Sequence, residues 1–142
     1  MRNKTKNRFV VINHAADLKI KVTAETLEEL FLKALEGMAY LMYRNFEVPV
    51  AAQITVPVKV SSLDINSLLT DFLSEVLYQS EAKRAVFFKA KLKRFSNSEL
   101  EAELAGRAVN KFDRNIKAVT YHNVRILRNP EGLWETEVIF NT

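Results

Sequence analysis

The chain has 142 residues, of which 48% are hydrophobic and 27% are charged, an ordinary composition for one globular domain with a sizeable core. It contains no cysteine, which excludes disulfides, thiolate zinc sites and thiol nucleophiles. No apolar run reaches the roughly 18 residues of a membrane span, and no signal peptide precedes Phe9, so the expected location is the cytoplasm.

The excess of positive charge lies in the first eight residues. The formal net charge is +4, and residues 1–8 contain Arg2, Lys4, Lys6 and Arg8 without any acidic residue. We expect residues 1–8 to form a disordered basic arm and residues 9–142 to form one domain that is formally neutral. Such an arm can contact RNA phosphates, although a solvated terminus without function explains the same composition.

The first part of the chain predicts two strands and a helix. Residues 9–12 have the pattern of a strand, and residues 18–24 alternate apolar with polar side chains, which predicts a second strand. Thr26 followed by Glu29 forms a capping box, so we expect a helix to begin there and to bury an apolar stripe. Asp17 has the parity of Lys19 and Lys21 and is expected to point away from the core.

A third strand and a second helix follow. Residues 53–60 alternate strictly, and Pro57, which lacks a backbone donor, predicts an edge strand. Asp64 is expected to cap the second helix, whose apolar stripe runs from Ile65 to Leu77.

Residues 88–92 and 100–104 predict a hairpin around a loop at residues 95–97. In this register three lysines lie opposite three glutamates, in the pairs Lys93–Glu99, Lys91–Glu101 and Lys89–Glu103. Such cross-strand ion pairs contribute about 0.2–1 kcal/mol each and chiefly fix the register. We therefore interpret these lysines as one face of a solvated sheet rather than as an RNA-binding stripe.

The last strands are predicted at residues 117–127 and 134–140, joined by a turn that contains Pro130 and Gly132. The order of elements predicts a single α+β domain, in which two helices pack on one side of a mostly antiparallel sheet.

The sequence offers little for catalysis. Its three glycines form no phosphate-binding loop, and no serine lies in a nucleophile elbow. His122 shares strand parity with Val124 and Ile126 and is interpreted as a half-buried structural histidine. We therefore expect that this chain alone is not an enzyme.

Three separated segments resemble the archease family in their order and spacing. They are INHAADLKIKVTAETLEELFLKALEGMAYLM at residues 12–42, IKAVTYH at residues 116–122 and WETEVIFN at residues 134–141. The resemblance implies the fold of that family and a non-catalytic accessory function, the activation of the tRNA-splicing RNA ligase. Archeases promote guanylylation of that ligase and its multiple turnover. The ligase is then the expected partner, RNA is associated indirectly, and GTP is used by the ligase rather than bound by this chain.

The resemblance also implies a site for a divalent cation, Ca²⁺ or Mg²⁺, held by carboxylate and carbonyl oxygens. The family's Asp-His-Thr-Ala-Asp motif reads Asn13-His14-Ala15-Ala16-Asp17 in this chain, its terminal Asp reads Asn141, and Arg107 stands at a position that is usually Glu. The implied metal ligands are Asp17, Asn141 and Thr142. The residues expected to orient these ligands or to stabilise the fold are Asn13, His14 and His122.

The neutral residues at acidic positions lower the expected metal affinity, because ligand charge largely determines how tightly a cation binds. The competing interpretation is that Asp17 caps a turn and that His14 packs as a structural residue. Two alternatives to ligase activation follow. One is a diverged archease-like binding or chaperone-like protein that has lost the metal site, and the other is direct RNA binding through residues 1–8.

Overall fold

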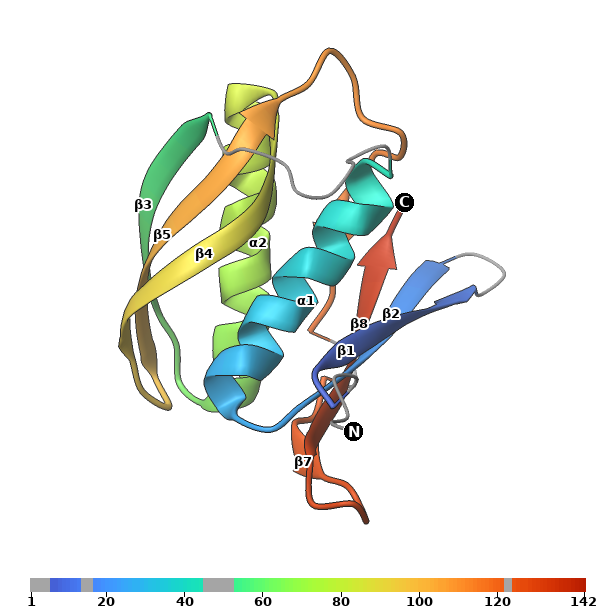
Figure 1. Ribbon diagram of the computed structural model, residues 1–142, viewed down its shortest axis with the longest axis vertical. Helices are drawn as coiled ribbons and strands as arrows, with labels where there is room; N and C mark the ends of the chain where they lie inside the picture. Colours follow the sequence, from blue (N-terminus) through green and yellow to red (C-terminus); the bar gives the residue numbers. More distant parts are fainter. Residues whose placement is uncertain (1–5, 14–16, 45–52, 122–123) are drawn as a thin grey trace, which may run out of the picture.

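Two antiparallel sheets enclose the two helices in the computed structural model of this chain (Figure 1). The structure describes residues 6–13, 17–44, 53–121 and 124–142. The elements in chain order are β1 (Arg8–Asn13), β2 (Asp17–Ala24), α1 (Leu27–Met42), β3 (Ile54–Ser61), α2 (Ile65–Lys83), β4 (Ala85–Phe95), β5 (Glu99–Ala108), β6 (Ala118–Val119), β7 (Leu127–Arg128) and β8 (Trp134–Asn141).

The strands form two sheets rather than the single sheet that we expected. One has the order β1-β2-β8-β6, with β7 also paired to β8, and the other has the order β3-β5-β4. Every pair is antiparallel. The α+β class is confirmed, and so is the edge position of β3, which accommodates Pro57 because a proline has no backbone donor to offer a second neighbour.

The helices begin where their capping residues predict. The Thr26 hydroxyl accepts a hydrogen bond from the Glu29 N–H at 3.1 Å, and the Asp64 carboxylate accepts one from the Ser67 N–H at 2.8 Å. In α1 the buried positions come in adjacent pairs, such as Leu30 with Phe31, so the apolar surface is wider than the stripe of a surface helix. This width suits a helix between two sheets, where α1 contacts β2 on one side and β4 on the other.

The β4–β5 hairpin forms as predicted, but the predicted pairing of its residues was wrong. Lys91 lies opposite Glu103 and Arg94 opposite Glu101, because the ladder shifts between Phe87 and Lys89 and again between Leu92 and Arg94. Each irregularity adds a residue to β4, and a regular alternation of side chains gives no sign of it. The predicted lysine–glutamate pairs are therefore not the observed ones: Glu101 pairs instead with Arg94 and with Lys59 of β3, each at 3.8 Å.

The strand predicted at residues 117–127 is wrong in extent. Only Ala118–Val119 and Leu127–Arg128 pair with β8, at its two opposite ends. Between them Tyr121 and Ile126 turn toward α2, where side chains of that helix accept their hydrogen bonds. Hydrogen bonds to side chains of α2 thus take the place of the strand pairing that the alternating apolar residues of 117–127 had predicted.

The domain includes residues 6–8, which were expected to belong to the arm. Arg8 pairs with Thr23 as the first residue of β1, Lys6 lies 3.4 Å from the Glu25 carboxylate, and the Asn7 amide donates to Glu29 at 2.7 Å. Residues 1–5 lie outside the described residues. In the part of the chain that the structure describes, no helix is long and apolar enough to span a membrane.

Candidate functional site

The strand ends of the five-stranded sheet bring Asp17 and Asn141 together. Asp17 begins β2 and Asn141 ends β8, and the antiparallel register places them directly opposite one another. Directly opposed residues point to the same face, with Cβ atoms about 4.5–5.5 Å apart. We call Asp17, Asn141 and the adjacent Thr142 the strand-end site.

The strand-end site lies on the face of the sheet that points away from the helices. Leu18, Ile20 and Val22 of β2 are buried, whereas Asp17 and Lys19 alternate with them and are only partly buried, as their parity predicts. Asn141 and Thr142 are exposed. A bound ion or a partner protein would therefore reach these side chains without any movement of the core.

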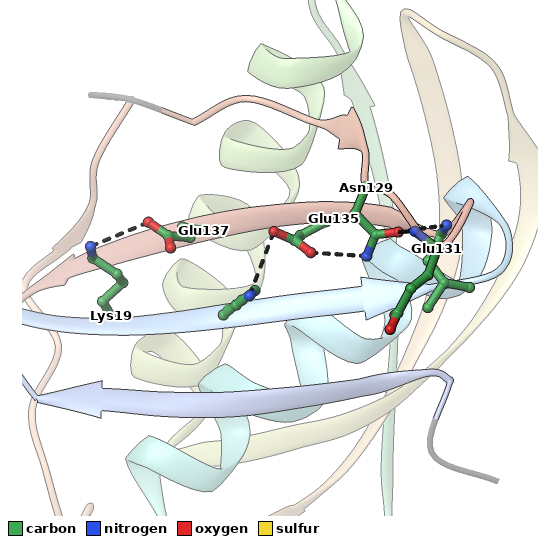
Figure 2. Close-up of polar contacts among 7 residues, drawn as sticks. Lys19, Asn129, Glu131, Glu135 and Glu137 are labelled. Atoms are coloured by element: carbon green, nitrogen blue, oxygen red, sulfur yellow. Dashed lines mark hydrogen bonds and ion pairs between the residues drawn. The ribbon is translucent and has the colours of Figure 1, made fainter. Parts of the chain in front are cut away.

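Ion pairs between β2 and β8 hold the register on which the strand-end site depends (Figure 2). Lys19 lies 3.2 Å from the Glu137 carboxylate and Lys21 lies 3.7 Å from the Glu135 carboxylate, both across the diagonal of the ladder. Each partly exposed pair contributes about 0.2–1 kcal/mol. A shift of one residue would break both pairs and turn Asp17 toward the core, so the pairs favour the observed opposition.

The strand-end site offers oxygen donors but little charge. Among the described residues, neither the Asp17 carboxylate nor the Asn141 side-chain amide has a hydrogen-bond or ion-pair partner. The Asn141 backbone carbonyl is occupied, since it accepts a hydrogen bond from the Lys117 N–H at 2.7 Å. Carboxylate, amide and hydroxyl oxygens of this kind could serve as ligands of a hard cation, for which one carboxylate contributes less affinity than two.

The described structure does not include the side chains of the three other predicted site residues. His14 and His122 lie outside the described residues, as does the side chain of Asn13, whose backbone pairs with Leu18. Arg107 belongs to β5 in the three-stranded sheet, not to the sheet that carries Asp17. Within the described residues no group of three or more His, Asp or Glu side chains is arranged to hold a metal.

The structure also contains a polar cluster that the sequence did not reveal. The Asp71 carboxylate of α2 accepts a hydrogen bond from the Tyr121 hydroxyl through one oxygen and from the Ser62 hydroxyl at 2.5 Å through the other. Asn66, one turn earlier in α2, accepts from the Ile126 N–H at 2.9 Å. We call this group the α2 clamp, since it holds Tyr121 and Ile126 against α2.

The α2 clamp raises the pKa of Tyr121 above its ordinary value of 10.0. The hydrogen bond to Asp71 is the largest cause, because only the neutral phenol can donate it, and partial burial and the negative charge of Asp71 act in the same direction. Tyr121 belongs to the segment IKAVTYH, so its motif was visible in the sequence. Its partner 50 residues away was not, since nothing near Asp71 marks that residue as an acceptor.

The fold is shared with solved structures. The solution structure of Methanobacterium thermoautotrophicum protein 1598 superposes with a TM-score of 0.75 at 27% identity, covering 94% of this chain and 98% of that one. The crystal structure of an archease, possible chaperone, from Thermotoga maritima superposes with a TM-score of 0.64, covering 100% of this chain and 98% of that one. At 20% identity the second likeness shows the fold alone.

The sequence comparisons place the chain more closely. Residues 9–141 match the Archease protein family (MTH1598/TM1083), and the chain belongs to this family. It is 31% identical over 142 residues to the protein archease of Pyrococcus furiosus, covering 89% of this chain and 92% of that protein. It is 29% identical over 140 residues to the protein archease of Methanosarcina mazei, covering 93% and 94%. The resemblance seen in the three sequence segments is thereby confirmed.

Proposed function

We propose that this protein is a non-catalytic accessory protein that activates an RNA ligase, promoting ligase guanylylation and multiple turnover in tRNA splicing or RNA repair. The observation that supports the proposal most directly is the match to the archease family over residues 9–141. The Thermotoga maritima structure, described as a possible chaperone, is compatible with an accessory function. GTP is consumed by the ligase, and the ligase holds the RNA.

The strand-end site is the part of the surface that we assign to this activity. Asp17 and Asn141 lie opposite one another, point away from the core and have no partner among the described residues. When a divalent cation is bound there, it would add positive charge at the surface that meets the ligase. Asp17 supplies the only side-chain carboxylate of the pair, so the affinity depends chiefly on this residue.

A turnover assay tests the proposal. The RNA ligase of the same organism is mixed with GTP, Mn²⁺ and a cleaved tRNA substrate, and the product formed per ligase is measured with and without this protein. We expect a change from a single turnover to many, and weaker stimulation by the Asp17→Ala variant. Glu99→Ala is the matched control, because Glu99 is an exposed acidic residue of the other sheet. No stimulation by the unmodified protein would refute the proposal.

A second candidate function follows from the charge of the strand-end site. Because Asn13 and Asn141 carry no charge, the site could have lost its metal while the protein acts as a binding or chaperone-like partner. Calorimetry with Ca²⁺ distinguishes the two. Binding in the micromolar range that Asp17→Ala abolishes contradicts the second function. Ca²⁺ binding that appears only in the Asn141→Asp variant, which restores a second carboxylate, supports the second function. We expect this variant to bind Ca²⁺ at least about tenfold more tightly than the unmodified protein.

A further inference from the structure

Six cations gather at the end of the molecule where both helices finish. We call this group the basic end: it consists of Lys83, Arg84, Arg107, Lys111, Arg114 and Lys117, whose backbone segments meet at this end of the molecule. The chain from residue 109 to residue 117 crosses this end above α2 and α1 (Figure 1).

Backbone hydrogen bonds fix residues 109–117 in this position. The Val109 N–H donates to the carbonyl of Arg84 at 3.0 Å, at the end of α2, and the Asp113 N–H donates to the carbonyl of Met42 at 2.8 Å, at the end of α1. The Lys117 N–H donates to Asn141 at 2.7 Å. The basic end is therefore ordered, and it reaches the strand-end site.

Within the described residues, the cations of the basic end form no ion pairs. Six other cations of the described chain each lie within 4.0 Å of a glutamate: Lys6, Lys19, Lys21, Lys33, Lys59 and Arg94. Among the described residues, no cation of the basic end has such a partner, and one oxygen of the nearby Asp113 carboxylate accepts a hydrogen bond from the Arg44 N–H at 2.7 Å. The Nε atom of Arg114 is buried and has no acceptor in the same part of the chain. Lys89 and Lys91 of β4 also have no ion pair among the described residues, so the basic end is distinguished by its place at the two helix ends and by the hollow that lies within it.

A hollow of about 380 Å³ lies within the basic end. Its polar lining consists of Arg84, Asn110, Lys111 and Asn115, with Glu81 as the single acidic residue. Guanidinium, ammonium and amide groups are the donors that proteins use most for phosphate oxygens. At about 380 Å³, the hollow is large enough for a sugar and its phosphate.

Helix dipoles explain part of this charge but not most of it. Lys83 and Arg84 end α2, where cations are favoured by the partial negative charge of the helix terminus. Arg107, Lys111 and Lys117 belong to other segments, so the preference for cations in the last turn of a helix does not account for their presence in the sequence. Their density requires another explanation.

We propose that the basic end binds the phosphodiester backbone of RNA without sequence specificity. This inference rests on the proposed function, because an accessory protein of an RNA ligase works beside RNA. It assigns the contact to the folded domain rather than to residues 1–8. RNA on the basic end lies next to the strand-end site, so this protein touches both the ligase and the RNA that the ligase joins.

Fluorescence anisotropy with a short labelled single-stranded RNA tests the inference on the protein alone. We expect binding whose affinity falls steeply with salt, because phosphate contacts release counterions. Lys111→Ala combined with Arg114→Ala is expected to weaken binding about tenfold or more and to lower the salt slope by about two. Lys111→Glu combined with Lys117→Glu changes only exposed side chains and should weaken binding further without affecting the fold.

Two matched controls test whether removing any two cations weakens RNA binding as much as removing those of the basic end. Lys89→Ala with Lys91→Ala removes two cations from a sheet face that also carries Glu101 and Glu103, and we expect less than about a twofold change in affinity. Arg2→Ala with Lys4→Ala tests the first residues of the chain and should change affinity as little. Equal losses in either control and in the basic-end variants would overturn the inference, as would absence of binding at low salt.

Combined with the turnover assay, the RNA-binding measurement distinguishes a failure of this inference from a failure of the proposed function. RNA binding without ligase stimulation contradicts the proposed function and leaves the RNA site established. Ligase stimulation by a protein that does not bind RNA refutes only the RNA site. If the basic-end variants then lose stimulation, the basic end contacts the ligase protein instead.

Discussion

The addition of a single methyl group at Gly106 is expected to lower the free energy of unfolding strongly. It lies in β5, the central strand of the three-stranded sheet, opposite Phe87 and beside the first irregularity of β4. A Cβ atom at this position would overlap the backbone carbonyl oxygen of Val86 and lie 2.8 Å from the Cα of Phe87. Both are backbone atoms, so no rotamer change can relieve the overlap and β4 itself must move.

The expected cost of Gly106→Ala follows from this geometry. Overpacking of a well-packed site costs about 1–3 kcal/mol, and a clash with backbone belongs at or above the upper end of that range. Alanine also lowers the conformational entropy of the unfolded chain, which stabilises the folded state by roughly 0.4–1 kcal/mol and offsets part of this cost. A net loss of about 2–3 kcal/mol lowers the Tm by about 6–12 °C for a domain of this size. Urea unfolding followed by circular dichroism measures the loss directly.

Gly37→Ala is the matched control, since it adds the same methyl group in α1. Its Cβ would lie 2.7 Å from Cδ1 of Ile20 and 3.2 Å from the ring of Phe9, which are side-chain atoms that can shift. The helix gains about 0.5–1 kcal/mol from the replacement of glycine. We expect stability within about 1 kcal/mol of the unmodified protein. A Gly106→Ala protein as stable as the Gly37→Ala protein would refute the reasoning.

Two further predictions concern side-chain hydrogen bonds. Tyr121→Phe should lower the free energy of unfolding by about 1 kcal/mol at pH 8, because Asp71 loses a donor. Because the pKa of Tyr121 is raised in the folded state, this difference in the free energy of unfolding is complete below pH 10.0 and disappears as the pH rises through the folded-state pKa. Urea unfolding of both proteins across that pH range measures the difference. A difference that persists above the folded-state pKa contradicts the prediction. Asp64→Ala should cost about 1 kcal/mol through loss of the cap on the Ser67 N–H, while Asp64→Asn, measured by thermal unfolding, should retain most of the stability.

The helices could be predicted because their signals are local. A capping residue and an apolar stripe lie within one stretch of sequence, so Thr26 and Asp64 mark the starts of α1 and α2 correctly. The existence of most strands follows from alternation in the same way. Two features escaped this reasoning because they depend on distant residues: the division into two sheets and the register of β4 with β5.

The candidate site could be predicted only in part. Parity within β2 predicts that Asp17 points away from the core, which the alternating burial of that strand confirms. Its opposition to Asn141 came from the resemblance to archeases, since no local pattern links residues so far apart. The α2 clamp and the basic end were missed, since each is assembled by contacts between segments that are separate in the sequence.

The position of β8 gives this protein an unusual dependence on the order of its synthesis. β2 lies between β1 and β8, so one edge of the β1–β2 hairpin has no neighbour until residues 134–141 have been made. At a translation rate of about 5–20 residues per second, the roughly 110 residues between β2 and β8 take about 5–20 s. Throughout that interval the nascent hairpin presents an open strand edge, which chaperones and neighbouring nascent chains can capture.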